Sequence, residues 1–476
     1  ISTVPQVQDV LAQVVDPPIE TLIPPNKTNL SSSLNAVLQT PPPDTLPPLA
    51  LTTTGLTIST VPQVQDVLAQ IAEATGKKPA LVYVNFISPN LTNPEFDNQQ
   101  FKQRELALAS EYQTLITPTL AQIPPTLAVP PRANYVLQLT VLIPGQEPYQ
   151  VVVPEASRDK ILAKARPLQR QLANQQDNYL DNASQLYQWL IAPIEQQLTT
   201  EKIDNVLFFL PSGLRTLPLS ALYDRSTQQF AVEKTFTLGT APSLNLVDYR
   251  YRNLNQAPVL AFGATDFPDQ NQSPLPGVGI ELPLIQSIKG GSYFLNQAFN
   301  LTNVETQRRE NPLPIVHLAT HAKFVAAAPR QSYIQLFDQR LVLPSWQDLA
   351  LNLPKTDLLV ISACESAVGN EDVELGFGGM AVQAGVKTAV ASLWPVGDIG
   401  TVGLMDGFYR SLKVTSTKAE ALQQVQRAML KGNYRWSGNQ LITPENTIDF
   451  PGSLPQNMDL RHPYYWSSFM MIGSPW

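Results

Sequence analysis

The C-terminal part of the chain alternates short apolar runs with stretches of helical spacing. The apolar runs occupy residues 205–210, 259–263, 315–321, 358–364 and 388–394. Uninterrupted apolar runs of this length are typical of parallel strands that helices cover on both faces. Residues 203–476 are therefore predicted to form an α/β domain with a parallel-rich sheet flanked by helices.

Two other patterns precede this domain. Runs that are rich in β-branched residues and alternate in polarity occupy 79–86, 135–143 and 149–153. Together with the turn-forming residues 144–147, they predict a small, mostly antiparallel β-rich subdomain over 78–156. Residues 157–202 carry apolar positions three and four apart, and this spacing predicts a helical connector.

The first part of the chain is rich in proline. Ten of the 43 prolines fall within residues 1–57, and proline blocks helices and central strands, so residues 1–77 are predicted to be a linker or wrapping segment. One thirteen-residue string occurs twice without a difference, at 1–13 and 58–70. It is interpreted either as two equivalent docking helices or as an artefact of how the sequence was assembled, and no function is assigned to it.

Charge and composition exclude several classes of protein. The 476 residues carry a net charge of −7, and binding to nucleic acid is not expected because it requires a basic surface. The chain has neither an apolar run of about 18 residues that would span a membrane nor the pattern of a signal peptide. A single cysteine forms no internal disulfide, so a reducing cytoplasm is the expected location.

Two candidate reactive side chains end neighbouring apolar runs. Cys364 closes the run 358–364, and His321 closes the run 315–321. Ligands of open parallel sheets bind at the carboxyl ends of the strands, so the two side chains are expected to meet there. A thiol beside an imidazole is the arrangement of a nucleophile and its general base.

The other histidines have a different interpretation. His317 lies four residues before His321, which in a strand corresponds to about 13 Å at about 3.3 Å per residue. The two rings therefore do not share a proton or a metal ion, and His317 is interpreted as structural. His462 lies in a C-terminal aromatic cluster and is interpreted as a packing residue. One cysteine and three histidines do not supply a thiolate-rich zinc site, so no metal site is predicted.

Five strings carry a family resemblance. They are His-Leu-Ala-Thr-His-Ala at 317–322, Ile-Ser-Ala-Cys-Glu-Ser-Ala-Val-Gly at 361–369, Glu-Leu-Gly-Phe-Gly-Gly-Met at 374–380, Ala-Ser-Leu-Trp-Pro-Val-Gly-Asp at 391–398 and His-Pro-Tyr-Tyr-Trp-Ser-Ser-Phe at 462–469. In this order they resemble the CHAT domain, a caspase-like cysteine protease domain related to separase, gingipains and caspases. The resemblance covers residues 203–476 and implies a caspase-like fold.

The resemblance also implies the roles of the site residues. Cys364 is expected to be the nucleophile and His321 the general base, and no cofactor is needed. The backbone N–H groups of Cys364 and Ala322 are expected to hold the oxyanion. Many relatives have glycine after the histidine, whereas this chain has Ala322, which keeps the N–H group.

Substrate specificity is predicted from one further match. Asp398 corresponds to the aspartate that receives a basic side chain in separase-like relatives, and a carboxylate in that place pairs best with arginine. An alternative is that Asp398 caps a helix starting near Gly400. Glu365, directly after the nucleophile, is a second candidate for lining the substrate pocket.

These observations predict a cysteine endopeptidase that cleaves after arginine, and less well after lysine, with His321 and Cys364 as a dyad. The expected partners are a protein or peptide substrate with a basic residue at the cleavage site and a regulatory protein. The alternative is a catalytically silent CHAT domain that serves as an interaction scaffold. A third hypothesis treats residues 1–75 as an inhibitory or activating arm.

Overall fold

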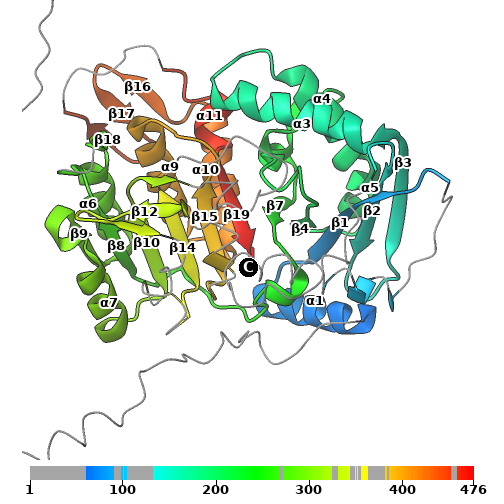
Figure 1. The fold of residues 1–476 in the computed structure, drawn as a ribbon, viewed down its shortest axis with the longest axis horizontal. Coiled ribbons are helices and arrows are strands. Elements are labelled where there is room, and N and C mark those ends of the chain that lie inside the picture. The colour runs from blue at the N-terminus through cyan, green and yellow to red at the C-terminus, as the bar shows by residue number, and fades with distance from the viewer. Residues whose placement is uncertain are drawn as a thin grey trace, which may run out of the picture. The chain divides into compact units, whose positions relative to one another are not determined.

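The computed structural model describes residues 60–90, 98–99, 101–103, 105, 132–268, 272–323, 331–342, 349, 351, 355–362, 381–382, 385–451 and 458–476. All of them belong to one compact unit, Thr53–Trp476. Its centre is an eleven-stranded sheet with the order β3-β2-β1-β4-β7-β19-β15-β14-β10-β8-β9 (Figure 1).

The strands of this sheet are short. They are β1 (Pro79–Ile87), β2 (Val136–Leu142), β3 (Tyr149–Ser157), β4 (Asn205–Phe209), β7 (Thr237–Thr240), β8 (Val259–Gly263), β9 (Gly291–Leu295), β10 (Ile315–Ala319), β14 (Leu358–Ser362), β15 (Thr388–Ser392) and β19 (Phe469–Gly473). Neighbouring strands are parallel except within β1-β2-β3 and between β15 and β19. This confirms the predicted parallel-rich sheet.

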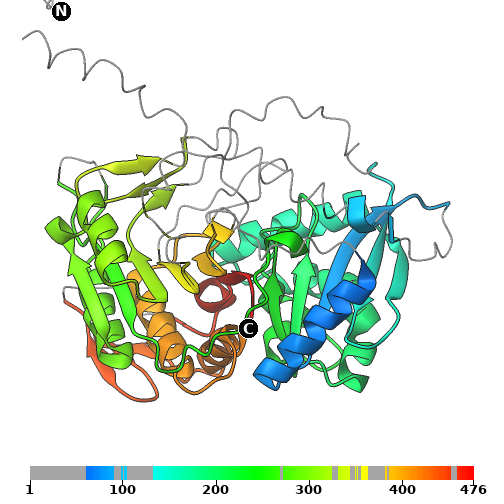
Figure 2. The same ribbon diagram turned by 90° about the horizontal axis from the view of Figure 1, so that it is seen from below.

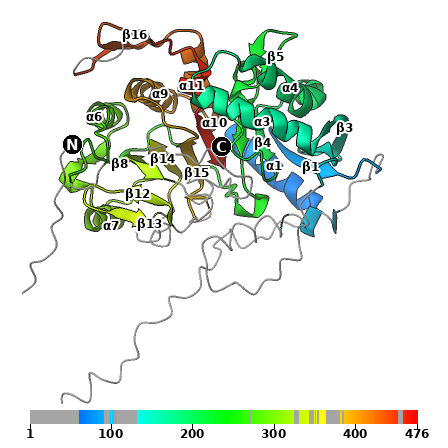
Figure 3. The same cartoon turned by 45° about the horizontal axis from the view of Figure 1, so that its top comes forward.

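Helices cover both faces of the sheet (Figure 3). They are α1 (Val61–Thr75), α3 (Arg158–Ala173), α4 (Leu180–Leu190), α5 (Ala192–Thr200), α6 (Val278–Lys289), α7 (Leu301–Glu310), α9 (Asp398–Ser411), α10 (Lys418–Leu430) and α11 (Pro463–Trp466). Helices α3, α4, α5, α6, α9 and α10 pack on one face, whereas α1 and α7 pack on the other. Side chains of β10 alternate between the two cores, because successive residues of a strand point to opposite faces.

Three small sheets complete the described structure. They are β11 (Ala322–Lys323), β12 (Tyr333–Gln335) and β13 (Arg340–Val342); β16 (Arg435–Ser437), β17 (Gln440–Ile442) and β18 (Thr447–Asp449); and β5 (Tyr223–Asp224) with β6 (Gln229–Phe230). The first of them begins directly after His321, so it fixes the chain on the far side of that residue.

The three strands of the expected β-rich subdomain pair antiparallel, as their alternation predicts. They do not form a separate sheet, because β1 also pairs in parallel with β4 from Pro79↔Asn205 to Tyr83↔Phe209. Residues 80–84 of β1 are all buried, and an unpaired edge beside so apolar a strand would expose its backbone groups. The alternation of polar and apolar residues along a strand does not indicate whether a second strand pairs with its other edge.

Helix α1 lies inside the range predicted as a linker or wrapping segment. It contains most of the second copy of the repeat and packs Val64, Leu68 and Ile71 onto β1 and β4 (Figure 2). Its proline stands in the first turn, where a missing N–H group costs no hydrogen bond. The first copy, 1–13, lies outside the described residues. No helix in the described ranges combines the length and apolar character needed to cross a membrane.

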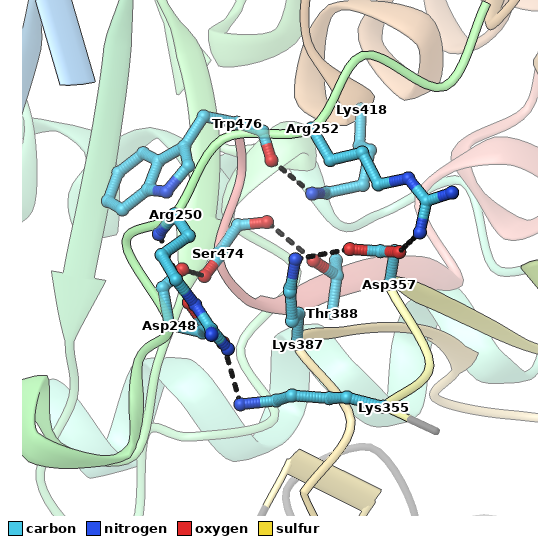
Figure 4. Close-up of polar contacts among 10 residues, drawn as sticks. All are labelled: Asp248, Arg250, Arg252, Lys355, Asp357, Lys387, Thr388, Lys418, Ser474 and Trp476. Atoms are coloured by element: carbon cyan, nitrogen blue, oxygen red, sulfur yellow. Dashed lines mark hydrogen bonds and ion pairs between the residues drawn. The ribbon is translucent and has the colours of Figure 1, made fainter. Parts of the chain in front are cut away.

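Two buried aspartates lie near the amino ends of β14 and β15 (Figure 4). Each is paired with two cations: Asp248 with Arg250 at 2.6 Å and Lys355 at 2.7 Å, and Asp357 with Arg252 at 2.9 Å and with Lys387. Burial alone would raise the pKa of Asp248, but hydrogen bonds from its two partners hold that pKa below the ordinary value. This paired network fastens the segment after β7 to the starts of two core strands.

Candidate active site

His321 lies where two parallel core strands end. Strands β10 and β14 are neighbours, and their last paired residues are Ala319 and Ser362. His321 follows Ala319 by two residues. Its Nε2 atom is 2.7 Å from the carbonyl oxygen of Ser273, and its ring lies 4.9 Å from the ring of Phe267. The imidazole is thus held from two sides at the carboxyl edge of the sheet.

The contact with Ser273 determines which ring nitrogen is basic. A carbonyl oxygen only accepts hydrogen bonds, so Nε2 of His321 must carry the proton. In a neutral imidazole the other nitrogen, Nδ1, then has the free lone pair. Sequence analysis missed Ser273, because every residue type offers a backbone carbonyl.

Two of the predicted site residues, Cys364 and Glu365, lie outside the described residues. Ser362 is the last described residue before them, at the end of β14. Its hydroxyl is buried, and no described group hydrogen-bonds to it.

Ala322 is the first residue of β11, directly after His321. Gln335 donates its N–H to the carbonyl of His321 at 2.8 Å, and the next pair along, Ala322↔Ile334, belongs to the same antiparallel ladder. Because hydrogen-bonded and non-bonded pairs alternate in such a ladder, the N–H of Ala322 faces away from β12. The geometry is compatible with the predicted role of this group as an oxyanion donor.

A cavity of about 120 Å³ lies beside His321. Its lining comes from the start of α6, the ends of β10, β14 and β15, and the start of α9; among the residues are Glu281, His321, Ser362, Ser392, Asp398 and Thr401. The structure therefore brings together His321, Asp398 and the strand that leads to Cys364.

Asp398 lies in the wall of this cavity and opens α9. The helix begins at Asp398 with Gly397 as its N-cap, so Asp398 is not the N-cap residue. Its Oδ2 atom accepts the N–H of Gly277 at 2.6 Å, and a Cβ atom at position 277 would come within 2.5 Å of the Asp398 side chain. Burial raises the pKa of Asp398, and the nearby charge of Glu281 raises it further, against the hydrogen bond from Gly277 and the charge of His321.

Glu281 is a buried residue that sequence analysis missed. It lies on α6 among apolar neighbours and also lines the cavity. Its Oε1 atom is 3.0 Å from Nε2 of His317, whose Nδ1 is 3.0 Å from the hydroxyl of Tyr409. A glutamate on the apolar face of a helix was the signal that it has a special environment.

The remaining histidines occupy structural positions. His317 is fully buried in β10, between Tyr409 and Glu281, and its ring points into the core. His462 is the N-cap of α11, where its Nδ1 accepts the N–H of Tyr464 at 3.0 Å, and it packs edge-on against Tyr179. Among the described residues no three His, Cys, Asp or Glu side chains are grouped as metal ligands.

Three solved structures align with parts of this chain. Caspase-1 from Spodoptera frugiperda aligns with 12% identity and a TM-score of 0.27, over 38% of this chain and 80% of that chain. The pro- and mature domains of RgpB from Porphyromonas gingivalis align with 10% identity and a TM-score of 0.36, over 67% and 76%. The separase–securin complex from Saccharomyces cerevisiae aligns with 9% identity and a TM-score of 0.36, over 88% of this chain and 32% of that chain.

One of two sequence comparisons supports the resemblance that the five strings indicate. No curated protein sequence matches the chain. The family model of the CHAT domain matches residues 180–474, which is more than half of the chain and begins at α4 rather than at residue 203. The chain therefore belongs to the CHAT domain family.

Proposed function

We propose that the chain is a cysteine endopeptidase that cleaves peptide bonds after arginine, and less well after lysine. Cys364 is the nucleophile and His321 the general base. The observation that carries the proposal is the hydrogen bond between His321 and Ser273, which leaves Nδ1 of the imidazole as the proton acceptor at the end of β10.

The register of the two strands supports the pairing of these residues. Ala319 of β10 and Ser362 of β14 are partners across parallel strands. His321 follows Ala319 by two residues, and Cys364 follows Ser362 by two residues. Neighbouring strands are about 4.8 Å apart, and two residues of chain span at most about 7 Å. This register supports the proposal that Cys364 meets the His321 ring.

The reaction follows from these groups. His321 takes the proton of the Cys364 thiol at Nδ1, and Sγ attacks the carbonyl carbon of the scissile peptide bond. The N–H groups of Ala322 and Cys364 stabilise the resulting oxyanion. The C–N bond then breaks, and His321 returns the proton to the leaving amine. Water, deprotonated by His321, hydrolyses the thioester and releases the new carboxylate and the thiol.

The cavity beside His321 is the proposed site for the side chain before the cleaved bond. Asp398 lies in its wall, and this carboxylate would pair with a basic side chain. The raised pKa of Asp398 supports the proposal, because a half-buried carboxylate without a described lysine or arginine partner is stabilised when a cationic ligand enters.

Labelling with an arginine-directed acyloxymethyl ketone, followed by mass spectrometry, tests the proposal. We expect an adduct on Cys364 in the parent protein and none in His321→Ala, because an unassisted thiol with a pKa near 8.5 is only a few per cent thiolate at neutral pH. Peptide cleavage should fall by at least about 10³-fold in Cys364→Ala and His321→Ala. Undiminished cleavage by Cys364→Ala would refute the assignment.

A further inference from the structure

The cavity beside His321 contains a second carboxylate, and it is more deeply buried than Asp398. Only 2% of Glu281 is exposed, its Oε1 atom lies 3.0 Å from Nε2 of His317, and its carboxylate has no lysine or arginine partner among the described residues. Glu281 and Asp398 line the same cavity, and the charge of Glu281 raises the pKa of Asp398. Like charges placed together in a buried site are unfavourable unless a cation joins them.

No lysine or arginine of the described residues joins Glu281 and Asp398. Asp248 and Asp357, the buried aspartates at the other edge of the sheet, each pair with two lysine or arginine side chains. Within the described residues, by contrast, neither Glu281 nor Asp398 pairs with any lysine or arginine. Glu281 contacts His317, and Asp398 accepts the N–H of Gly277.

The hydroxyl of Ser362 is an independent observation in the same cavity. The residue is 9% exposed, and its Oγ atom is buried with no hydrogen-bond partner among the described groups. Buried polar atoms in folded proteins nearly always have a hydrogen-bond partner, so this hydroxyl can accept a hydrogen bond from a ligand group that enters the cavity. This hydroxyl and the two carboxylates give the cavity several acceptors, and no described lysine or arginine lines it.

A guanidinium group matches this set of acceptors. It carries five N–H donors in a rigid plane, so two carboxylates approach different edges and a hydroxyl accepts a further N–H. An ammonium group carries three donors at a single point and cannot bridge separated acceptors in the same way. Because both side chains carry one positive charge, the cavity is expected to distinguish arginine from lysine by the geometry of the N–H donors.

We propose that Glu281 is a second specificity-determining residue, which binds the guanidinium of an arginine side chain together with Asp398 and the hydroxyl of Ser362. His317 is a positioning residue that holds Glu281 from the core side. The inference deepens the proposed function, since cleavage after arginine rests on the peptidase assignment, but guanidinium binding itself does not require turnover.

Equilibrium binding measurements test guanidinium binding separately from peptidase activity. In Cys364→Ala protein, which cannot turn over, calorimetry with N-acetyl-arginine amide should detect binding at least about ten-fold tighter than with the lysine analogue. The citrulline analogue has the same shape without the charge, and its binding should fall below detection. Glu281→Gln should weaken binding of the arginine probe by about 10–100-fold, the effect expected for a lost charge-assisted contact. Ser362→Ala should weaken it by about two- to ten-fold.

Glu195→Gln is the matched control. Glu195 pairs with Lys234 at 2.8 Å and does not line the cavity, so its loss should leave probe binding unchanged. Thermal unfolding of each variant shows whether it is folded. If Glu281→Gln fails to fold, the Ser362→Ala variant and the arginine–citrulline comparison in Cys364→Ala protein still decide the matter.

The outcomes distinguish this inference from the proposed function. A folded Glu281→Gln protein that binds the arginine probe as tightly as its parent overturns the inference, as does equal binding of arginine and citrulline. Cleavage after other residues with no arginine binding would overturn the inference while the peptidase assignment stands. Arginine binding that depends on Glu281, in a protein that cleaves no peptide, would support the inference and refute the peptidase assignment.

Discussion

Carboxylates at the two edges of the central sheet differ in their charge partners and in the direction of their pKa shifts. At the amino edge, Asp248 and Asp357 each contact two cations, and the pKa of Asp248 is lowered in spite of burial (Figure 4). At the carboxyl edge, Glu281 and Asp398 share a cavity in which no described lysine or arginine pairs with them, and the pKa of Asp398 is raised.

This difference separates a structural role from a functional one. A buried charge with its own partners is satisfied before any ligand arrives, and it holds segments of the chain together. A buried charge without a partner carries a cost that only a ligand removes, and such groups gather at binding and catalytic sites. The same sheet therefore holds carboxylates paired with lysine or arginine at one edge, and at the other edge, where we propose the ligand site, carboxylates without such partners among the described residues.

The largest effect should follow from breaking a pair at the amino edge. Asp357→Asn leaves Lys387, whose side chain is only 11% exposed, without its charge partner. Removing one partner of a buried ion pair typically costs about 3–5 kcal/mol, and because Arg252 is largely exposed we expect about 3 kcal/mol. Urea unfolding at neutral pH measures this loss, and cleavage by the folded protein should remain at the parent level.

An exposed pair provides the control for this prediction. Asp459 and Arg461 are 2.8 Å apart, with side chains 57% and 64% exposed. Surface pairs contribute at most about 1 kcal/mol, so Asp459→Asn should change the unfolding free energy little. If Asp357→Asn is no less stable than Asp459→Asn, the amino-edge network is not a source of cohesion and the comparison fails.

Lowering the pH should change the contributions of Asp248 and Asp398 to the stability of the fold with opposite signs. Folding holds the pKa of Asp248 below, and that of Asp398 above, their ordinary value of 3.8. Because the pKa of Asp248 is lowered on folding, its carboxylate stabilises the fold at pH values above its ordinary pKa. That stabilisation is lost as the pH falls through the pKa of the folded state. A raised pKa has the opposite sign, because its cost is full above the folded pKa and disappears as the pH falls through the ordinary value.

Asparagine variants at both positions test these signs. Near neutral pH, Asp248→Asn should lower the urea midpoint of unfolding and Asp398→Asn should raise it. The difference for Asp398→Asn should disappear as the pH falls through the ordinary value of 3.8, whereas the difference for Asp248→Asn should only begin to shrink below that value, because the folded Asp248 is still ionised there. Loss of stability in Asp398→Asn at neutral pH would place this carboxylate with the paired groups, since its bond from Gly277 would then outweigh burial and the charge of Glu281.

The sequence was sufficient for the parts of the site that follow from strand pattern. Apolar runs ending near His321 and Cys364 predicted parallel strands with a shared carboxyl edge, and β10 and β14 are neighbours there. The start of α9 was expected near Gly400 and lies at Asp398. The dyad and the specificity pocket remain predictions, because Cys364 and Glu365 lie outside the described residues.

Other features depend on contacts between distant segments and leave weak signals in a single sequence. The carbonyl of Ser273 reaches His321 across 48 positions of sequence, and no side chain marks it. Glu281 is marked in the sequence only as a glutamate among apolar helix residues, and its contact with His317 arises only in the folded protein. The parallel pairing of β1 with β4 likewise joins segments that the alternation pattern treats separately.

The smallest expected change in stability comes from removing one buried hydroxyl at each edge of the sheet, and this pair of variants tests the comparison most directly. Thr388 opens β15, is fully buried, and donates its hydroxyl to the carbonyl of Ser474 at 2.7 Å, whereas the Ser362 hydroxyl that ends β14 has no described partner. Loss of a satisfied hydrogen bond costs about 1 kcal/mol, so Thr388→Val, which keeps the side-chain shape, should lower the free energy of unfolding by that amount. Ser362→Ala removes an unsatisfied polar atom and should leave stability unchanged or slightly raised while it weakens arginine binding. Equal losses in the two variants, measured by urea unfolding, would mean that Ser362 has a partner within the folded protein and that the carboxyl edge is not held open for a ligand.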